Sequence, residues 1–366
     1  MTTSTTGLDL DLGGLELDEL QAELERLGEP RFHGRQIFEW IHRHGVTDLG
    51  RMTNISRSLR ESLAASRSIH TPALVDRESS SDGTVKSRLR LSDGREIEAV
   101  FIPDTPAQTL CLSTQVGCAM ACAFCLTGLM GWVRHLSAGE IVGQVRSLAA
   151  DHGLVGRRFN LVLMGMGEPL HNYDATMKAL RILTSAHGLG MSPRRITLST
   201  VGLVPALDRL AGEAIMPNLA VSLHATTDEL RSRLVPTNRK YGVNDLVAAC
   251  RRFPLAKRAR ITFEYVLLSG VNDSAADARR LATLLSGLKC KVNLLPFNEA
   301  AGLPFVRPSE AAVNTFAKTL SDRGVLVSVR KSRGRDIRAA CGQLIVEGPT
   351  ASPAQKLARH LPPADH

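Results

Sequence analysis

Three cysteines lie close together in the chain, at Cys118, Cys122 and Cys125. Three thiolates at this spacing can bind three corners of a four-iron cluster, and the fourth iron is then left without a protein ligand. Iron–sulfur sites built for electron transfer usually take four protein ligands. A three-ligand site therefore indicates that a substrate or a cofactor binds the open iron.

The spacing is also the one used by enzymes that cleave S-adenosylmethionine (SAM) reductively to make a carbon radical. A [4Fe–4S] cluster and SAM are therefore the expected cofactors. Two more cysteines bear on this hypothesis. Cys111 lies seven residues before the first cluster ligand, and Cys341 follows a basic, glycine-containing loop that would keep its thiol accessible. Cys250 and Cys290 fit the role of small buried residues.

The composition predicts a cytoplasmic protein and is compatible with, but does not by itself indicate, nucleic-acid binding. The 366-residue chain has a formal net charge of +9, and phosphates attract Lys and Arg. Aromatic residues make up only 4%, which argues against a broad base-stacking platform. The seven cysteines, the lack of a secretory signal and the lack of a long apolar run predict a cytoplasmic location without a membrane span.

Strand-like and helix-like segments alternate through most of the chain. This alternation predicts βα units and a parallel sheet. About six units are too few for a closed eight-stranded barrel, so the expected fold class is α/β, with a partial (β/α)6 radical SAM barrel. The expected strands are 109–115, 159–165, 194–200, 218–224, 260–267, 290–297 and 325–330. The expected helices between them include 137–150, 172–185, 273–286 and 308–322.

A small helical accessory domain is expected before the barrel, and its basic face is either a solvated surface or an RNA contact surface. Its helices are expected near 17–27, 31–45 and 55–65. Residues 68–84 are polar and predict a linker, and a β-hairpin extension follows around the Asp93-Gly94 turn. The expected divisions are an accessory domain at 1–70, the linker and hairpin at 71–108, the radical SAM core at 109–346 and a mobile tail at 347–366.

Polar residues follow several of the predicted strands, where parallel α/β sheets bind their ligands. At Gly167 the missing side chain would let the backbone approach the methionine part of SAM closely. The carboxylate of Glu168 can accept hydrogen bonds from the SAM ammonium group. His224 belongs either to this site or to the buried core. Candidates for the carboxylate, ribose or adenine of SAM end other strands: Ser199, Ser222 and Asn298.

Short motifs occur in a fixed order along the chain: Ser-Thr-Gln-Val-Gly-Cys (113–118), Met-Gly-Met-Gly-Glu-Pro (164–169), Thr-Leu-Ser-Thr (197–200), Ser-Leu-His (222–224), Asn298 and Ala-Ala-Cys-Gly-Gln-Leu (339–344). Together they resemble the radical SAM RNA methyltransferases that act on adenine carbons, the RlmN/Cfr family. The resemblance spans residues 31–346, nearly the whole chain.

This resemblance implies a division of work among five cysteines. Cys118, Cys122 and Cys125 would bind the cluster. One SAM would methylate Cys341, and a second would be cleaved to a radical that takes a hydrogen atom from this methyl group. The resulting carbon radical would add to an adenine. Cys111 would then attack the sulfur of Cys341, which forms a transient disulfide and releases the product. The implied SAM contacts are Gly167, Glu168, Ser199, Ser222, Leu223, His224 and Asn298.

A general base must also remove the adenine proton. By position the resemblance assigns this role to Glu98, and the alternative for this residue is an exposed strand carboxylate. Carbon 2 of adenine is not nucleophilic, so a polar methyl transfer would fail and a radical is needed. The implied partners are RNA and a reducing electron donor such as flavodoxin or ferredoxin, and the enzyme is expected to be a monomer.

The expected substrates are an adenosine in the peptidyl transferase centre of 23S rRNA and an anticodon-loop adenosine of tRNA, because chemistry on a base requires its extrusion from the stack. The basic stretch 330–338 would guide the phosphate backbone towards Cys341. Two alternatives stay open: methylation at carbon 8, as in the Cfr-type branch, and a non-enzymatic iron–sulfur protein that binds RNA or senses redox state. Glu168-Pro169 and Arg333-Gly334 favour carbon 2.

Two stretches depart from the family pattern. Leu126 stands where a small residue is usual. Trp132 and His135 belong to a segment that reads aromatic-x-Arg-Asn-Leu in the family. Both stretches lie close to the cluster ligands in sequence, so SAM packing and substrate choice are the properties expected to differ.

Overall fold

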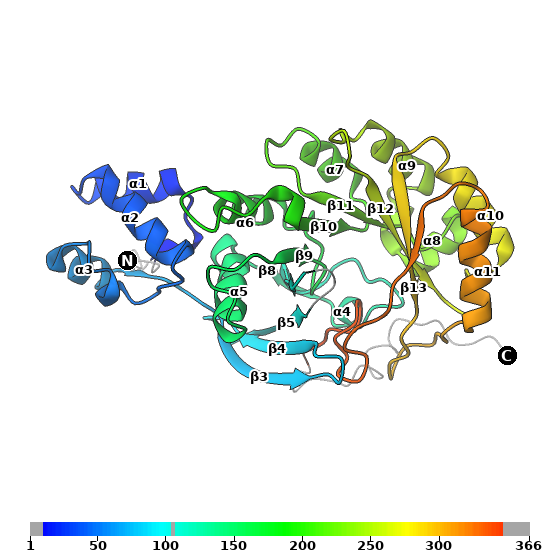
Figure 1. The fold of residues 1–366 in the computed structure, drawn as a ribbon, viewed down its shortest axis with the longest axis horizontal. Coiled ribbons are helices and arrows are strands. Elements are labelled where there is room, and N and C mark those ends of the chain that lie inside the picture. The colour runs from blue at the N-terminus through cyan, green and yellow to red at the C-terminus, as the bar shows by residue number, and fades with distance from the viewer. Residues whose placement is uncertain (1–9, 104–106, 347–366) are drawn as a thin grey trace, which may run out of the picture.

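The computed structural model describes residues 10–103 and 107–346. A ten-stranded sheet runs through this part of the chain (Figure 1). In sheet order, its strands are β14 (Val327–Val329), β13 (Cys290–Pro296), β12 (Ile261–Leu267), β11 (Asn218–Ser222), β10 (Ile196–Thr200), β9 (Asn160–Leu163), β6 (Thr109–Cys111), β5 (Glu96–Ile102), β4 (Val85–Arg90) and β3 (Ala73–Ser79).

Within this sheet, β6 and the strands β9 to β14 pair in parallel, which is the arrangement that alternating strands and helices require. Their residues are buried on both faces, as Leu219, Ala220 and Val221 of β11 illustrate. The two end strands, β14 and β3, are not hydrogen-bonded to each other, so the sheet stays open. The predicted partial barrel is thereby confirmed.

Helices connect the parallel strands and lie on the outer side of the sheet (Figure 1). The four predicted helices are present, and three further helices between β10 and β12 were not predicted. The predicted helices are α5 (Ala138–Asp151), α6 (Tyr173–Thr184), α10 (Ala275–Leu284) and α11 (Glu310–Ser321), and the additional ones are α7 (Val204–Leu210), α8 (Asp228–Leu234) and α9 (Val243–Arg252).

The N-terminal helices form a separate unit at one end of the molecule (Figure 1). They are α1 (Leu17–Arg26), α2 (Arg31–His42) and α3 (Arg57–Ala64), as the periodicity of leucine and isoleucine predicts. Two short parallel strands, β1 (Leu10–Asp11) and β2 (Arg67–Ser68), close the unit. The Glu16 carboxylate, just before α1, accepts a 2.9 Å hydrogen bond from Arg181 of α6, which ties the unit to the barrel.

The linker predicted at 68–84 is not present as such, because residues 73–79 form β3 at the edge of the main sheet. Six of the seven β3 residues are exposed, so no alternation of apolar and polar residues marks the strand. The hairpin of β4 and β5 forms as predicted and pairs with β6 through β5. Together with β3, the hairpin therefore extends the barrel sheet by three antiparallel strands.

A loop and the C-terminal segment complete the described chain. The loop lies between β7 (Gln115–Gly117) and β8 (Trp132–His135) and includes the short helix α4 (Leu126–Leu129). After β14 the chain crosses back towards α4 and the β3–β5 edge (Figure 1). The predicted mobile tail at 347–366 lies outside the described residues. No helix of the described chain is long and apolar enough to cross a membrane.

Candidate active site

One cavity at the carboxyl ends of the parallel strands brings most of the predicted site residues together. Eleven of the thirteen line it: Cys111, Cys118, Cys122, Cys125, Gly167, Glu168, Ser199, Ser222, His224, Asn298 and Cys341. The cysteines come from the end of β6, the β7–β8 loop and the segment after β14, so residues more than 200 positions apart share one site. The two predicted residues that do not line it are Leu223 and Glu98.

The three clustered cysteines are held in a loop that can form only with glycine at its start. Gly117 has φ +74°, and a side chain there would come within 1.9 Å of the Gly131 carbonyl oxygen. That same carbonyl accepts a 2.9 Å hydrogen bond from the backbone N–H of Cys118. The close contact fixes the base of the loop and turns its thiols into the cavity.

The chemistry of these thiols fits a bound iron–sulfur cluster. Burial, with a smaller contribution from Cys125, raises the pKa of Cys118 to about 12. Burial and then the charges of Cys125 and Cys118 also raise the pKa of Cys122. Three thiolates this close repel one another unless a cationic centre compensates them. In the described chain, no three His, Cys, Asp or Glu side chains lie close enough to bind one metal ion together. An iron–sulfur cluster does not require this, because each cysteine binds a different iron atom of the cluster.

Glu168 is buried in the loop that follows β9, and backbone donors hold both of its oxygens. Oε1 accepts from the N–H of Leu170 at 3.0 Å, and Oε2 accepts from the N–H of Val201 at 2.9 Å. Burial nonetheless raises the pKa of Glu168 to about 7, because these hydrogen bonds offset only part of the desolvation. A cationic ligand in the cavity would favour the carboxylate form.

His224 is a neutral residue of both the core and the cavity wall. It has φ +60°, and its carbonyl oxygen accepts from the side-chain amide of the buried Asn272 at 2.8 Å. Burial lowers the pKa of His224 to about 3. Its Nδ1 accepts a 3.0 Å hydrogen bond from the N–H of Val266, so the neutral ring carries its proton on Nε2. His224 is therefore a buried residue that also lines the cavity, and its contact with SAM stays a prediction.

Cys341 is exposed and lies near Cys111, and both are free thiols. Burial and the charge of Cys341 raise the pKa of Cys111 to about 12. The segment that bears Cys341 is attached to the cysteine loop: the N–H of Leu126 donates to the Gly342 carbonyl at 2.7 Å, and the Thr127 hydroxyl donates to the Leu344 carbonyl at 2.6 Å. The two thiols therefore lie in the same cavity as the clustered cysteines.

Comparison with known proteins places the chain in a family whose chemistry fits this cavity. Residues 112–282 match the radical SAM superfamily, and residues 10–69 match the N-terminal domain of ribosomal RNA large subunit methyltransferases. The chain is 50% identical over 335 residues to the dual-specificity RNA methyltransferase RlmN of Geobacter sulfurreducens, covering 92% of each chain. The chain belongs to the RlmN family of radical SAM RNA methyltransferases.

Further matches agree with this assignment. The RlmN of Pelobacter propionicus is 48% identical over 91% of this chain and 95% of its own. The crystal structure of a radical SAM methyltransferase from Sphaerobacter thermophilus superimposes with a TM-score of 0.88 at 48% identity, covering 92% of this chain and 99% of that one. As a member of the RlmN family the enzyme uses a [4Fe–4S] cluster and SAM. The alternative of a non-enzymatic iron–sulfur protein is therefore wrong.

Within this RlmN-family enzyme, the structure locates Glu98 and Leu223 away from the cavity. Glu98 is buried in β5 and lines an adjoining cavity, where its carboxylate lies 3.2 Å from Lys86 Nζ and accepts from the N–H of Ile345 at 2.8 Å. It is thus not the exposed strand carboxylate that was its alternative. The Leu223 side chain is fully buried in the core, and its carbonyl accepts from Arg231 at 3.0 Å.

The departures from the RlmN family pattern have structural roles. Leu126 is buried at the start of α4. His135 contacts the side-chain amide of Gln115 at 3.0 Å, and His171 contacts the same amide at 3.0 Å. Gln115 in turn accepts a 2.8 Å hydrogen bond from the N–H of Glu168. His135 therefore supports the Glu168 turn through Gln115. Trp132 is about half exposed beside both histidine rings.

Sequence reasoning missed one residue that organises the strand ends. Arg231 is fully buried and donates to the carbonyls of Val201, Ser222 and Leu223 at 2.6, 3.1 and 3.0 Å. It thereby satisfies the free carbonyls where β10 and β11 end. Nothing in the sequence distinguishes it from other helix arginines, since its partners lie on strands distant in the chain.

Proposed function

We propose that this enzyme methylates carbon 2 of adenosine, both in the peptidyl transferase centre of 23S rRNA and in the anticodon loop of tRNA. The observation that carries the proposal is the shared cavity of Cys341, Cys111 and the three clustered cysteines. The relatives are named dual-specificity RNA methyltransferases, and the N-terminal match is to ribosomal RNA large subunit enzymes. The net charge of +9 agrees with an RNA substrate.

Cys118, Cys122 and Cys125 would hold the cluster. Gly167, Glu168 and the other strand-end residues would hold SAM, with the Glu168 carboxylate facing its ammonium group. When bound, SAM would supply the methyl group and the radical that abstracts hydrogen. The cluster would supply the electron that generates this radical and would take one electron back later in the reaction. The protein supplies the positions of the thiols and of the base.

Cys341 would carry the methyl group. Its thiolate takes a methyl cation from SAM, and the S-methyl group then loses one hydrogen atom. The resulting carbon bonds to adenine C2, and the ring is restored by loss of one electron, which the cluster would accept, and of the C2 proton. Glu98 is the proposed acceptor of this proton, and since it lies outside the cavity of the cysteines, a water would carry the proton to it. Attack of the Cys111 thiolate on the Cys341 sulfur forms the disulfide and breaks the sulfur–carbon bond, and the released carbon takes up a proton. A cellular thiol reductant then regenerates both cysteines.

We further propose that the enzyme works as a cytoplasmic monomer with a flavodoxin or ferredoxin as electron donor. Seven free cysteines in the chain agree with a reducing compartment. The negatively charged surface that such donors carry would complement the positive net charge of the enzyme.

Mass spectrometry of nucleosides tests the proposal. The enzyme is reconstituted anaerobically and incubated with SAM, reductant and either 23S rRNA or tRNA, and the RNA is digested. We expect 2-methyladenosine from both RNAs. If 8-methyladenosine forms alone, the assignment of carbon 2 is wrong, and if only one RNA is modified, the dual specificity is wrong.

A further inference from the structure

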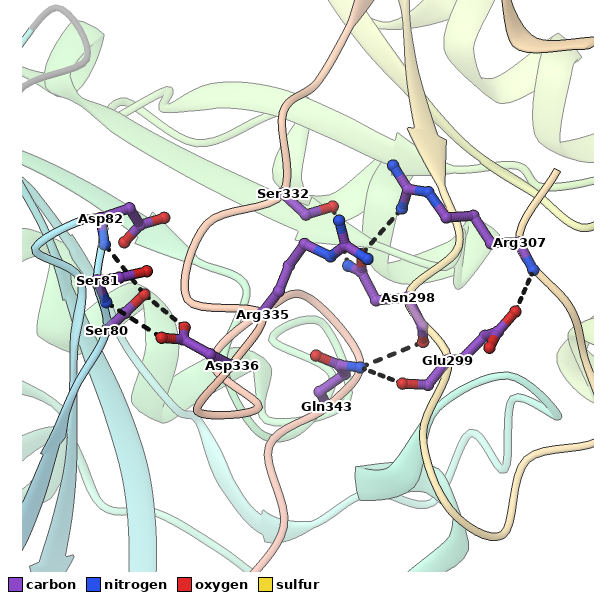
Figure 2. Close-up of a pocket in the computed structure, with 10 residues that line it drawn as sticks. All are labelled: Ser80, Ser81, Asp82, Asn298, Glu299, Arg307, Ser332, Arg335, Asp336 and Gln343. Carbon is purple, nitrogen blue, oxygen red and sulfur yellow. Dashed lines mark hydrogen bonds between the residues drawn. The ribbon is translucent and has the colours of Figure 1, made fainter. Parts of the chain in front are cut away.

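A polar cavity of about 520 Å³ adjoins the catalytic cavity, and three residues line both: Asn298, Ser332 and Gln343. Figure 2 shows its remaining lining residues, which are Ser80, Ser81, Asp82, Glu299, Arg307, Arg335 and Asp336. The β3–β4 turn forms one side of the cavity, the chain after β13 forms another, and the segment after β14 lies between them. A ligand in this cavity would therefore lie next to the cavity that contains Cys341.

Arg307 is fixed in this cavity by neutral acceptors. One of its terminal nitrogens donates to the carbonyls of Pro296 and Phe297 at 3.2 and 2.9 Å and to the side-chain oxygen of Asn298 at 3.1 Å. The nearby Glu299 carboxylate accepts from the backbone N–H of Arg307, not from its guanidinium. No carboxylate of the described chain forms an ion pair with Arg307, and the charges of Glu310 and Glu299 offset only part of the effect of burial and of Arg335 on its pKa.

Arg335 brings a second positive charge to the same place. Its side chain extends towards Asn298 and the Arg307 guanidinium (Figure 2). Burial and then the charge of Arg335 lower the pKa of Arg307, which shows that the two guanidinium groups repel each other. Within the described residues, Arg335 has no ion pair or hydrogen-bonded side-chain partner.

The two aspartates that line the cavity accept hydrogen bonds from the β3–β4 turn and from the backbone, not from the arginines. Asp336 accepts from the Ser80 hydroxyl at 2.5 Å and from the N–H of Ser81 at 3.1 Å. Asp82 accepts from the N–H of Gly334 at 3.0 Å. These bonds fasten the loop that carries Arg335 to the β3–β4 turn. The acids therefore position the loop and do not neutralise the arginines.

We propose that Arg307 and Arg335 bind a phosphate group of the substrate RNA next to the target adenosine. Two guanidinium groups that line one cavity and have no ion-paired carboxylate among the described residues can both donate to one phosphate. A nucleotide extruded into an active site needs its backbone held in register, and phosphate contacts provide this. The inference rests on the proposed function, because it requires an RNA substrate.

The contacts of Asn298 link the phosphate site to the catalytic cavity. Its side-chain oxygen accepts from Arg307, and its side-chain nitrogen donates to the Ser332 hydroxyl at 2.9 Å. A phosphate bound by Arg307 would therefore hold Asn298 and the segment that leads to Cys341 in one arrangement. The site would position RNA without reading its sequence.

The test compares Arg335→Gln with Arg258→Gln, since both arginines are exposed and Arg258 lines neither this cavity nor the catalytic cavity. The cluster-loaded full chain is titrated with a fluorescent RNA stem-loop bearing the target adenosine, at several salt concentrations. We expect Arg335→Gln to weaken binding roughly tenfold. The slope of log K against log salt should also fall by about 0.7, the value for one contact to a single-stranded phosphate. Arg258→Gln should bind like the wild type.

A second measurement identifies the phosphate. Single methylphosphonate replacements are placed along the loop, and one next to the target adenosine should weaken binding of the wild type but not of Arg335→Gln. Equal binding by both variants, or equal sensitivity to every position, would overturn the inference.

A third measurement separates the phosphate-site inference from the proposed function. The protein is incubated with SAM but without RNA, and methylation of Cys341 is followed by the mass of the intact protein. Arg335→Gln should be methylated normally, and a loss there would assign Arg335 to the SAM site instead. If the wild type methylates RNA but Arg335→Gln binds it normally, the phosphate site alone is wrong. If the wild type neither binds nor methylates RNA, the proposed function and the inference both fail.

Discussion

The Arg330 guanidinium lies 3.7 Å from the sulfur of Cys341 and donates to it. The Cys341 thiolate is the largest cause of the raised pKa of Arg330, and Arg330 also acts on Cys111. One positive charge thus faces both cysteines that the proposed reaction joins. It would stabilise a thiolate on Cys341 when that residue accepts a methyl group.

Arg330→Gln should slow the alkylation of Cys341 by iodoacetamide about 10- to 100-fold, because a charged hydrogen bond to the thiolate is lost. Peptide mass spectrometry after timed quenching measures the rate at Cys341. The neighbouring exposed Lys331→Gln serves as the control and should react like the wild type. Equal alkylation rates in Arg330→Gln and the wild type would show that Arg330 does not stabilise the Cys341 thiolate.

Lys86→Met should move the acid limb of the activity profile to higher pH. Burial raises the pKa of Glu98, and the adjacent Lys86 opposes that rise. Without the ammonium group the pKa of Glu98 rises further, so a larger fraction of the base is protonated at any acidic pH. We expect single-turnover methylation at pH 6 to fall roughly tenfold, with little change in alkaline solution.

The exposed Arg90 on the same strand provides the control for Lys86, because its ion pair with Glu96 lies outside the Glu98 cavity. Arg90→Gln should keep the wild-type profile. An unshifted profile in Lys86→Met would show that Glu98 does not limit the reaction on the acid side.

Gly167→Ala should destabilise the fold and weaken SAM binding together. Gly167 has φ +101°, and an added Cβ would lie 2.6 Å from Cβ of Gln115. The resulting displacement reaches Glu168, which Gln115 orients. Urea unfolding should show a loss of roughly 2–4 kcal/mol, and calorimetry should show weaker SAM binding. Gly212→Ala is the control, because the nearest atom is 3.5 Å away. Similar behaviour of both variants would contradict the steric argument.

His42→Leu should make the protein more resistant to acid. Burial lowers the pKa of His42 well below its usual value, and neither ring nitrogen has a partner in the described chain. Below about pH 6.5 the unfolded chain binds a proton that the folded chain does not, so stability falls by about 1.4 kcal/mol per pH unit. Urea unfolding at pH 7.5 and 5.5 should show a smaller loss for His42→Leu. The exposed His44→Gln is the control, and identical losses in both variants would contradict this role.

The sequence allowed prediction of those features that depend on residues close together in the chain. The barrel strands are apolar runs that end in polar residues, and their spacing marks the three clustered cysteines, so both could be assigned without coordinates. Strand β3 could not, because water covers both of its faces and no apolar pattern forms. The short helices α7 and α8 contain seven residues each, too few to establish a periodicity.

In the site, too, local motifs could be predicted from the sequence, whereas contacts between distant residues could not. Ser222 and His224 line the cavity, but Leu223 between them points into the core, and the motif alone does not separate the three. The Glu98–Lys86 pair and the Arg330–Cys341 contact depend on side-chain placement across the fold. Sequence identified Arg330 only as one of several basic residues, because its partner is fixed by the return of the chain after β14.

A single measurement on Cys111→Ala tests the central claim most directly. The variant is incubated with SAM, reductant and RNA, digested with protease and nuclease, and analysed by mass spectrometry. We predict a peptide in which Cys341 is joined through one methylene group to C2 of adenosine, because no thiol remains to release it. Cys290→Ala should yield free 2-methyladenosine like the wild type. Full release of methylated adenosine by Cys111→Ala, with Cys341 unmodified, would contradict the account.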